Sequence, residues 1–546
     1  MPLIPEQLTR HARRVGEVVG ILAKYGLADW LSGGGFELPK KFLVSSDGDK
    51  LTDYTRPERI RMAVAELGTT YIKLGQMLST RGDLVGWEIA DELAKLQTDV
   101  RPDAPEVTLA TISSELGKPA AEVFAEFAEE PMASASIGQV HRARLQDGTD
   151  VVVKVQHPDI ESRIRVDLEI LLVLAEFAER AAELKRYQPA RVVSEFQRTL
   201  LRELDFKREE RNIAEFTEHF AKNTDVRFPK TFPEFSTARV LTMEMLEGVS
   251  FRDADKSPNL TVSRDELARR GAILWMDMIF RDGFYHADPH PGNLIIMNDG
   301  TLGVLDCGMV GRMDDHLREH VEELLVCVAN QDGPMLARIL MRLCNAGGDF
   351  DEGAFAADIT DFISFYGSQP IEHFQLGNAL NEIARCISRY RLVLPSSMAQ
   401  VLKVLVMLDG TAKLLSPKLN LIAIIGPYQH RILLRQLSPR RQFKKLNRLL
   451  TEWRYVAHEL PGGMMRLLKE LQDGKFDIHL EHRRLEPAVN RLVMGMVVSA
   501  LFLGSSMLLS NKVPPLFYDH SILGLVIFLV SGFLGLRLIW KIWRNE

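Results

Sequence analysis

Three polar residues in the middle of the chain stand at a spacing that suits phosphoryl transfer. The segment His286-Ala-Asp288-Pro-His-Pro-Gly-Asn293 is followed by Asp306-Cys-Gly308. Phosphoryl transfer from ATP needs a carboxylate that orients the acceptor, and oxygen ligands for the Mg²⁺ that bridges the phosphates. Asp288 and Asn293 fit the H-x-D-x-x-x-x-N form of a kinase catalytic loop, and Asp306 takes the place of the Asp-Phe-Gly aspartate. We therefore predict Asp288 as the catalytic residue, and Asn293 and Asp306 as metal ligands.

A lysine in a predicted strand lies upstream, in Val151-Val-Val-Lys154-Val. The kinase lysine that contacts the α- and β-phosphates occupies such a strand and pairs with a glutamate of the next helix. Several glutamates follow in the helical segment 202–216. Glu209 is the preferred partner and Glu203 the alternative, because helical spacing alone does not decide between them.

The loop that would cover the phosphates departs from G-x-G-x-x-G. The chain has Ala133-Ser134-Ala135-Ser136-Ile137-Gly138 instead. Glycine lets the backbone approach a phosphate closely, whereas the Cβ of alanine adds bulk and restricts φ. Serine hydroxyls and backbone N–H groups still bind phosphate, so we expect these six residues to contact ATP or ADP in an altered pose, with weak or conditional transfer. The G-x-x-x-x-G-K-[ST] motif is absent, which excludes a P-loop ATPase.

Hydrophobic periodicity indicates the elements that position these residues. The spacing predicts a strand hairpin over 139–155, helices over most of 159–220, and two strands in 294–308 around a turn at Asn298. Further strands are predicted for 227–236 and 238–248. The chain then divides into five parts, namely helices at 1–118, a β-rich lobe at 119–249, a helix-rich lobe at 250–415, more helices at 416–490, and two apolar spans at 491–540.

The two apolar runs near the C-terminus, Leu492 to Ser510 and Ser521 to Leu536, carry no charge. The first is long enough to cross a bilayer as a helix, and the second is short. Basic residues gather on the outer flanks, so the positive-inside bias predicts a membrane hairpin with both flanks and the catalytic part in the cytoplasm. The alternative is a buried helical hairpin of a soluble core. The basic residues are Arg483, Arg484, Arg491, Arg537, Lys541 and Arg544, with only Lys512 between the runs.

Composition narrows the function further. The chain has 546 residues, 46% of them hydrophobic, and a net charge of -6, which gives no basic field for nucleic acid. Its 4 cysteines are scattered, which argues against a disulfide scaffold or zinc module and suits a reducing compartment.

Taken together, these motifs resemble the UbiB/AarF atypical kinase-like family over residues 55–415. Besides the segments above, the resemblance rests on K-x-G-Q at Lys73 to Gln76, S-I-G-Q-V-H at 136–141, V-K-V-Q-H-P at 153–158, and E-x-D at Glu203 and Asp205. It implies an α+β, atypical protein-kinase-like bilobal fold with an N-terminal helical cap and a C-terminal transmembrane hairpin.

The resemblance also implies roles for the cap and a setting for the chemistry. The helix that carries Lys73 and Gln76 would fold over the active site, where Lys73 would meet Glu203 or Asp205 and leave Glu209 to Lys154. The implied cofactors are ATP (or ADP) and Mg²⁺. The implied partners are membrane lipids, quinone precursors and proteins of isoprenoid-quinone biosynthesis. The amphipathic N-terminus is compatible with contact to a membrane or to a second protomer in a homodimer.

The resemblance implies a membrane-bound atypical kinase or ATPase, and three other functions stay open beside it. A small-molecule kinase of the aminoglycoside or choline type shares H-x-D-x-x-x-x-N, although K-x-G-Q and the apolar spans speak against it. An ordinary protein kinase is disfavoured by the missing glycines. A non-catalytic nucleotide-sensing scaffold is the third, and the full set of Lys154, Asp288, Asn293 and Asp306 argues against it.

Overall fold

The structure is a computed structural model of the 546-residue chain. It describes residues 6–27, 54–96, 100–180, 187–256, 262–344, 350–367, 375–426, 485–511, 513–517 and 520–543, with the isolated residues 185, 369, 428 and 450. The chain divides into two compact units, Met1–Ser438 and Pro439–Glu546, and each is described by itself.

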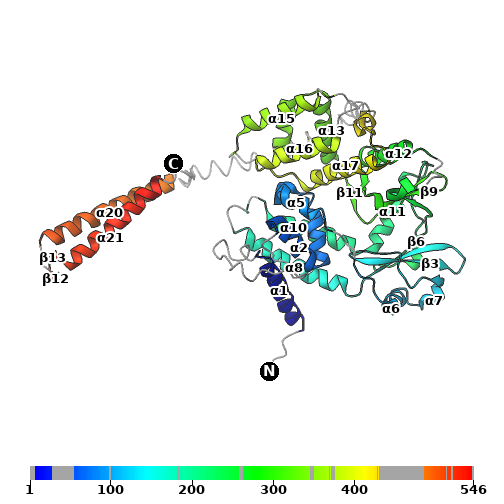
Figure 1. Ribbon diagram of the computed structural model, residues 1–546, viewed down its shortest axis with the longest axis horizontal. Coiled ribbons are helices and arrows are strands. Elements are labelled where there is room, and N and C mark those ends of the chain that lie inside the picture. Colours follow the sequence, from blue (N-terminus) through cyan, green and yellow to red (C-terminus); the bar gives the residue numbers. More distant parts are fainter. Residues whose placement is uncertain are drawn as a thin grey trace. The chain divides into compact units, whose positions relative to one another are not determined.

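An antiparallel sheet forms within the part of the chain predicted to be rich in β-structure (Figure 1). Its order is β1-β3-β4-β6, with β2 paired to β3, and the predicted hairpin is confirmed as β3 and β4. Alternate residues of β4 face opposite sides of the sheet. Val151, Val153 and Val155 are therefore buried in one core, and Lys154 faces the other side. The strands are β1 (Phe124–Phe127), β2 (Ala133–Ser134), β3 (Gly138–Leu145), β4 (Asp150–Gln156) and β6 (Val240–Glu244).

Helices precede this sheet, as predicted for 1–118. Thr55 and Glu58 form a reciprocal capping box that starts α2, and Gly68, with φ +96°, separates α2 from α3. The break lets α3, which carries Lys73, leave the direction of α2. These helices are α1 (Glu6–Lys24), α2 (Arg56–Leu67), α3 (Thr69–Leu78), α4 (Gly82–Val85), α5 (Trp87–Leu93), α6 (Pro105–Leu116) and α7 (Ala120–Val123).

Three longer helices lie between β4 and β6 in sequence, where helices were predicted. They are α8 (Ile160–Ala178), α10 (Pro189–Glu203) and α11 (Phe206–His219). Two residues after the end of α10, Asp205 caps the start of α11, because its carboxylate accepts a hydrogen bond of 3.1 Å from the N–H of Lys207. This short corner fixes the direction in which α11 leaves α10.

The strand predicted for 227–236 is wrong beyond its first residue. Only Val226–Arg227 forms a strand, β5, and Pro233–Phe235 is a turn of 3-10 helix. Pro229 and Pro233 lack the N–H that a sheet ladder needs, which explains the interruption. The predicted lobe boundary at 249 falls inside β7 (Gly248–Ser250), which pairs with β9 of the second sheet.

A second, small sheet packs with helices in one extensive core, which also includes residues of α8, α10 and α11. The sheet has the order β5-β10-β9-β7, and the two strands predicted within 294–308 are confirmed as β9 and β10. Most of the predicted helical part 416–490 lies outside the described residues. The other elements are α12 (Arg264–Met276), a π-helical turn (Asp277–Asp282), β8 (Phe284–His286), β9 (Leu294–Met297), β10 (Leu302–Val304), β11 (Val310–Arg312), α13 (Asp315–Ala329), α14 (Gly333–Leu343), α15 (Glu352–Gly367), α16 (Leu376–Arg389) and α17 (Ser396–Leu415).

The second unit contains a helical hairpin, α20 (Leu485–Ser510) and α21 (Ile522–Trp543), joined by the short strands β12 (Leu516–Phe517) and β13 (His520–Ser521). Phe502 and Phe528 pack with ring centroids 4.7 Å apart. Among the described residues one helix, Leu492–Ser510, is long and apolar enough to cross a membrane, and Ile522–Leu538 is a shorter apolar helix. Arg483, Arg484, Lys512 and Arg544 lie outside the described residues.

Replacing Gly138 by alanine is expected to destabilise the small sheet, because a Cβ there would lie 2.3 Å from the carbonyl oxygen of Val155. We expect a loss of about 1–3 kcal/mol of unfolding free energy. In α1, a Cβ at Gly20 would meet nothing within 4 Å, so Gly20→Ala is expected to be neutral or to stabilise by about 0.5–1 kcal/mol. Thermal unfolding of the full chain in detergent measures both, and an unchanged midpoint for Gly138→Ala would contradict the close approach.

Candidate active site

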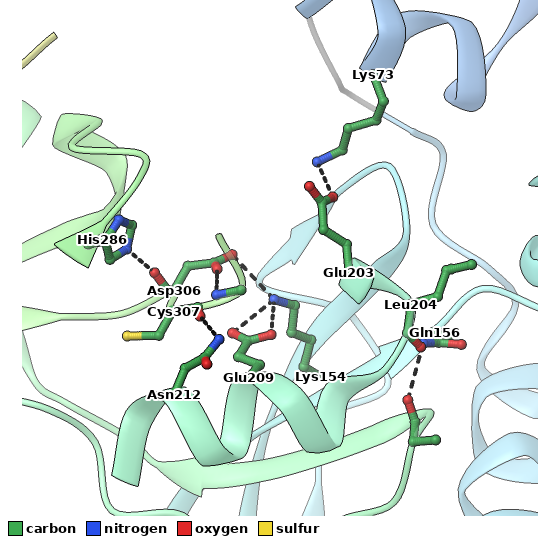
Figure 2. Close-up of polar contacts among 12 residues, drawn as sticks. Lys73, Lys154, Gln156, Glu203, Leu204, Glu209, Asn212, His286, Asp306 and Cys307 are labelled. Atoms are coloured by element: carbon green, nitrogen blue, oxygen red, sulfur yellow. Dashed lines mark hydrogen bonds and ion pairs between the residues drawn. The ribbon is translucent and has the colours of Figure 1, made fainter. Parts of the chain in front are cut away.

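The candidate site is centred on the ammonium group of Lys154, which lies between two carboxylates (Figure 2). Its Nζ is 2.9 Å from Oε2 of Glu209 on α11 and 3.2 Å from Oδ2 of Asp306, which follows β10. The preferred pairing of Lys154 with Glu209 is therefore confirmed. Lys154 also lies over the ring of Phe206, 5.3 Å from its centroid. Strand, helix and loop thus place three charged groups at one point.

The charges of this cluster are strongly coupled, because two carboxylates share one ammonium group. Burial raises the pKa of Glu209, Lys154 lowers it, and the negative charge of Asp306 raises it. The combined effect is a pKa of about 7. Desolvation opposes ionisation of Asp306 as well, but Lys154 and the N–H of Gly308, 2.8 Å away, hold its pKa below the usual range. Asp306 is therefore the more anionic of the two carboxylates, and its side chain is 48% exposed. That exposure suits an aspartate that binds a cation from solvent.

The catalytic-loop residues are held to Asp306 by the buried ring of His286. Its Nδ1 accepts the N–H of Asp288 at 3.1 Å, and its Nε2 contacts the carbonyl oxygen of Asp306. Both contacts are satisfied by the tautomer with its proton on Nε2. The side-chain amide of Asn293 donates to Oδ2 of Asp288 at 3.1 Å. The same hydrogen bond orients Asn293 so that its Oδ1 remains available as a ligand.

The Ala-Ser loop, residues 133–138, is tied down by backbone contacts rather than free to bend. The N–H of Ala135 donates to the carbonyl oxygen of Gly138 at 2.9 Å, and the N–H of His157 donates to that of Ile137 at 3.0 Å. Gly138 is required by the close approach of β4, as shown above. The hydroxyl of Ser134 is buried and has no hydrogen-bond partner within the described part of the chain. An unsatisfied buried hydroxyl is costly, so a phosphate oxygen is a fitting partner for it.

The two acids of the E-x-D motif, Glu203 and Asp205, make different contacts. Lys73 of α3 pairs with Glu203 at the end of α10, with 2.9 Å between Nζ and Oε2. Asp205 instead caps α11 and lies 3.4 Å from Arg208. The expected contact of Lys73 with this motif is therefore confirmed for Glu203. Gln76 follows Lys73 on the same short helix, one turn closer to the C-terminal end.

Sequence reasoning missed two residues of this neighbourhood. The side-chain amide of Asn212 donates to the carbonyl oxygen of Cys307 at 2.9 Å, which fastens α11 to the turn after Asp306. Its spacing of three residues from Glu209 on a helix could have indicated it. The ring of His157 bridges the carboxylate of Asp103, 2.6 Å away, and the carbonyl oxygen of Ala135, 2.9 Å away. No local pattern indicated this second contact, because its partners are distant in sequence.

Comparisons with known proteins bear on this arrangement. Residues 95–340 match the ABC1 atypical kinase-like domain, 359–420 the UbiB helical domain, and 477–544 the ABC1/UbiB kinase-like C-terminal domain. The chain is 31% identical to the "Probable protein kinase UbiB" of Shewanella baltica over 98% of both chains. The chain belongs to the ABC1/UbiB atypical kinase-like family. It is also 31% identical to the protein of that name from Pseudomonas aeruginosa, over 83% of this chain and 87% of the relative, and 29% identical to an "Uncharacterized protein in hydrogenase 1 5'region" of Clostridium pasteurianum, over 97% and 99%.

Membership of this family makes the fold kinase-like, with mixed helix and sheet, and the residues present fit Mg-ATP. Mg²⁺ in kinase sites is held by one or two protein oxygens and by the phosphates. Asp306 and Asn293 offer such oxygens. In the described part of the chain there is no group of three or more His, Cys, Asp and Glu side chains suited to a metal. A metal at this site would therefore depend on the nucleotide for its remaining ligands.

The raised pKa of Glu209 predicts a pH-dependent difference between the wild type and Glu209→Gln. A carboxyl whose pKa rises from 4.5 in the unfolded chain to about 7 stabilises the fold below pH 4.5, and this contribution is lost as the pH rises through about 7. Glutamine titrates in neither state, so Glu209→Gln is expected to gain stability relative to the wild type over that interval.

The measurement is the unfolding midpoint of both proteins from pH 4.5 to 8, without Mg²⁺ or nucleotide. The control compares Glu209 with Glu209→Gln in an Asp306→Asn background. Without the negative charge of Asp306, the pH dependence of the difference in unfolding midpoint should be smaller. A difference in midpoint that stays constant with pH would show that Lys154 keeps Glu209 ionised throughout.

Proposed function

We propose that the chain is a membrane-bound ATPase or kinase that binds Mg-ATP and supports isoprenoid-quinone biosynthesis or lipid handling. The observation that carries the proposal is the convergence of Lys154, Glu209 and Asp306, with Asp288 and Asn293 linked to Asp306 through His286. Ion pairs occur in many cores, but this set brings together each group that phosphoryl transfer requires.

Each side chain has a role that follows from its position. Lys154 binds the α- and β-phosphates while Glu209 keeps its ammonium group in place. The Ala-Ser loop covers the phosphates, and Ser134 donates its hydroxyl to one of their oxygens. Asn293 and Asp306 hold Mg²⁺, which when bound neutralises phosphate charge. Asp288 orients the attacking water or acceptor hydroxyl and takes its proton.

The cap favours hydrolysis or a small acceptor over a protein substrate. Lys73 and Glu203 form an ion pair whose side chains are 21% and 11% exposed, so the cap is held down by a well-shielded contact. A protein segment would have to displace this contact to reach Asp288. ATP hydrolysis coupled to another event agrees better with a closed cap and a loop that is poor in glycine.

The membrane part of the proposal rests on α20 and on the relatives. The apolar side chains of α20 are mostly exposed within the hairpin unit, for example Leu503 at 67% and Met507 at 68%. This exposure does not favour a buried hairpin of a soluble core. Relatives named UbiB point to ubiquinone-type biosynthesis, so the proposed partners are membrane lipids, quinone precursors and the proteins that modify them. The proposed location is the inner membrane, with the catalytic part in the cytoplasm. A homodimer is a further part of the proposal.

The test is Mg²⁺-dependent phosphate release from ATP by the full chain, with and without anionic phosphatidylglycerol liposomes. Asp288→Asn should lower kcat by about 10²–10⁴-fold and retain nucleotide binding, because it loses only the proton acceptor. Asp306→Asn should lose Mg²⁺-dependent binding. The exposed Asp299, in the turn between β9 and β10, provides the control Asp299→Asn, which is expected to match the wild type.

Release that liposomes stimulate and both site variants abolish would support a membrane-coupled ATPase. Tight ATP binding without turnover in any condition would replace the proposal by the nucleotide-sensing scaffold. A phosphorylated small molecule in place of free phosphate would favour a small-molecule kinase.

A further inference from the structure

We propose that Lys403, contributed by the helical domain, contacts the γ-phosphoryl group of the nucleotide bound at this site. The inference rests on the proposed function and adds a residue to it. Lys403 lies on α17, within the part of the chain that matches the UbiB helical domain and outside the kinase-like match.

The catalytic loop itself provides no cation for the γ-phosphoryl group. Between Asp288 and Asn293 the chain reads Pro-His-Pro-Gly, without lysine or arginine. His290 turns its Nδ1 back to accept the N–H of Gly292 at 3.1 Å. Charge spreads over the γ-phosphoryl oxygens during transfer, and fixed positive groups around them stabilise it. Lys154 is assigned to the α- and β-phosphates, so a further cation must come from another element.

Helix α17 runs between the two halves of the site. Near its start, the hydroxyl of Ser396 donates to the carboxylate of Glu195 on α10. Near its end, the hydroxyl of Thr411 donates to the carbonyl oxygen of Pro289, next to Asp288, at 2.7 Å. These contacts are separated by about 22 Å of helix. One end of α17 is thereby fixed to the helix of Glu203, and the other to the catalytic loop.

Lys403 lies between these two fixed points. It comes seven residues after Ser396, or about two turns, and therefore shares the side of α17 that meets α10. On α10, Glu203 comes eight residues after Glu195, a similar distance along its helix. Lys403 interacts electrostatically with Glu203 at the end of α10, the residue that pairs with Lys73 of the cap.

The electrostatic surroundings agree with this placement. The ammonium group of Lys403 is half-buried, and burial lowers its pKa. It is attracted by Asp288 and Glu203 and repelled by Lys73. Among the residues that the structure describes, however, no carboxylate lies within ion-pair distance of it.

The other two lysines of the site are compensated. Lys73 and Lys154 each have a carboxylate at 2.9 Å. Lys403 alone, within the described part of the site, faces Asp288 as a cation without a close partner. A half-buried ammonium group without an anion is costly, and an anionic ligand beside Asp288 would supply the missing charge.

The reaction that Lys403 would assist is hydrolysis or its equivalent with a hydroxyl acceptor. The acceptor oxygen forms a bond to the γ-phosphorus while the bond from that phosphorus to the bridging oxygen breaks. ADP leaves with the electron pair, and the acceptor proton passes to Asp288. Lys403 donates hydrogen bonds to the γ-phosphoryl oxygens throughout. These hydrogen bonds become stronger as negative charge is redistributed on the oxygens.

The test compares ligands with and without a γ-phosphate on the full chain in the presence of Mg²⁺. Lys403→Met should leave the Kd for ADP within about twofold and weaken the non-hydrolysable imido analogue of ATP about tenfold or more, as expected for a lost charge-assisted hydrogen bond. It should also lower kcat for phosphate release. Lys403→Arg keeps the charge and should recover part of the affinity for the imido analogue and part of kcat.

The matched control is Lys418→Met, which removes an exposed lysine just beyond α17 and should bind both ligands as the wild type does. Equal losses for ADP and the analogue, or no loss for either, would overturn the assignment of Lys403 while nucleotide binding by the wild type still upheld the proposed function. A wild type that binds neither ligand would overturn both. Should Lys403→Met unfold, Lys403→Gln, which also removes the charge, gives the same comparison.

Discussion

The buried ammonium group of Lys154 is the constraint on which the site depends. Burial of an unpaired charge is costly, so the fold must bring carboxylates to it. One is Glu209 of α11, and the other is Asp306 in the turn after β10 of the second sheet. Alternation along β4 decides which face Lys154 takes. The ion cluster therefore joins the two sheets, and the order of the strands places the cluster where a nucleotide can reach Asp306.

The corner between α10 and α11 relates the cap to this cluster. Glu203 is the last residue of α10 and holds Lys73, whereas Asp205 caps α11 and so sets the direction of the helix that carries Glu209. The side chain of Gln156, from the same strand as Lys154, donates to the carbonyl oxygen of Leu204 between them (Figure 2). A movement of the cap that pulled on Glu203 would thus be transmitted to the helix that positions the Lys154 partner.

The sequence predicted the structure correctly where a local pattern of residues determines the secondary structure. Alternation predicted the β3–β4 hairpin, and helical periodicity predicted the helices before and after it. The family resemblance assigned Glu209 to Lys154 and left Glu203 or Asp205 to Lys73, and packing decides for Glu203. The strand predicted at 227–236 fails because two prolines remove ladder donors, a local signal that hydrophobicity obscured. His157 and Lys403 were missed because their partners lie far away in the chain. Asn212 was missed although its helical spacing from Glu209 could have indicated it.

Because the Ala-Ser loop is fixed, helices α3 and α17, which lie outside the two sheets, matter for the proposed chemistry. A glycine-rich loop can close over the phosphates by bending, whereas this loop is fixed by Gly138 against β4 and by the ring of His157 against Ala135. A fixed loop cannot supply closure, so enclosure of the γ-phosphoryl group must come from the other side. That side is formed by α3 of the cap and α17 of the helical domain, and α17 is fastened to the catalytic loop through Thr411. In the proposed site of this chain, the cap and the helical domain would therefore enclose the γ-phosphoryl group that the fixed loop does not cover.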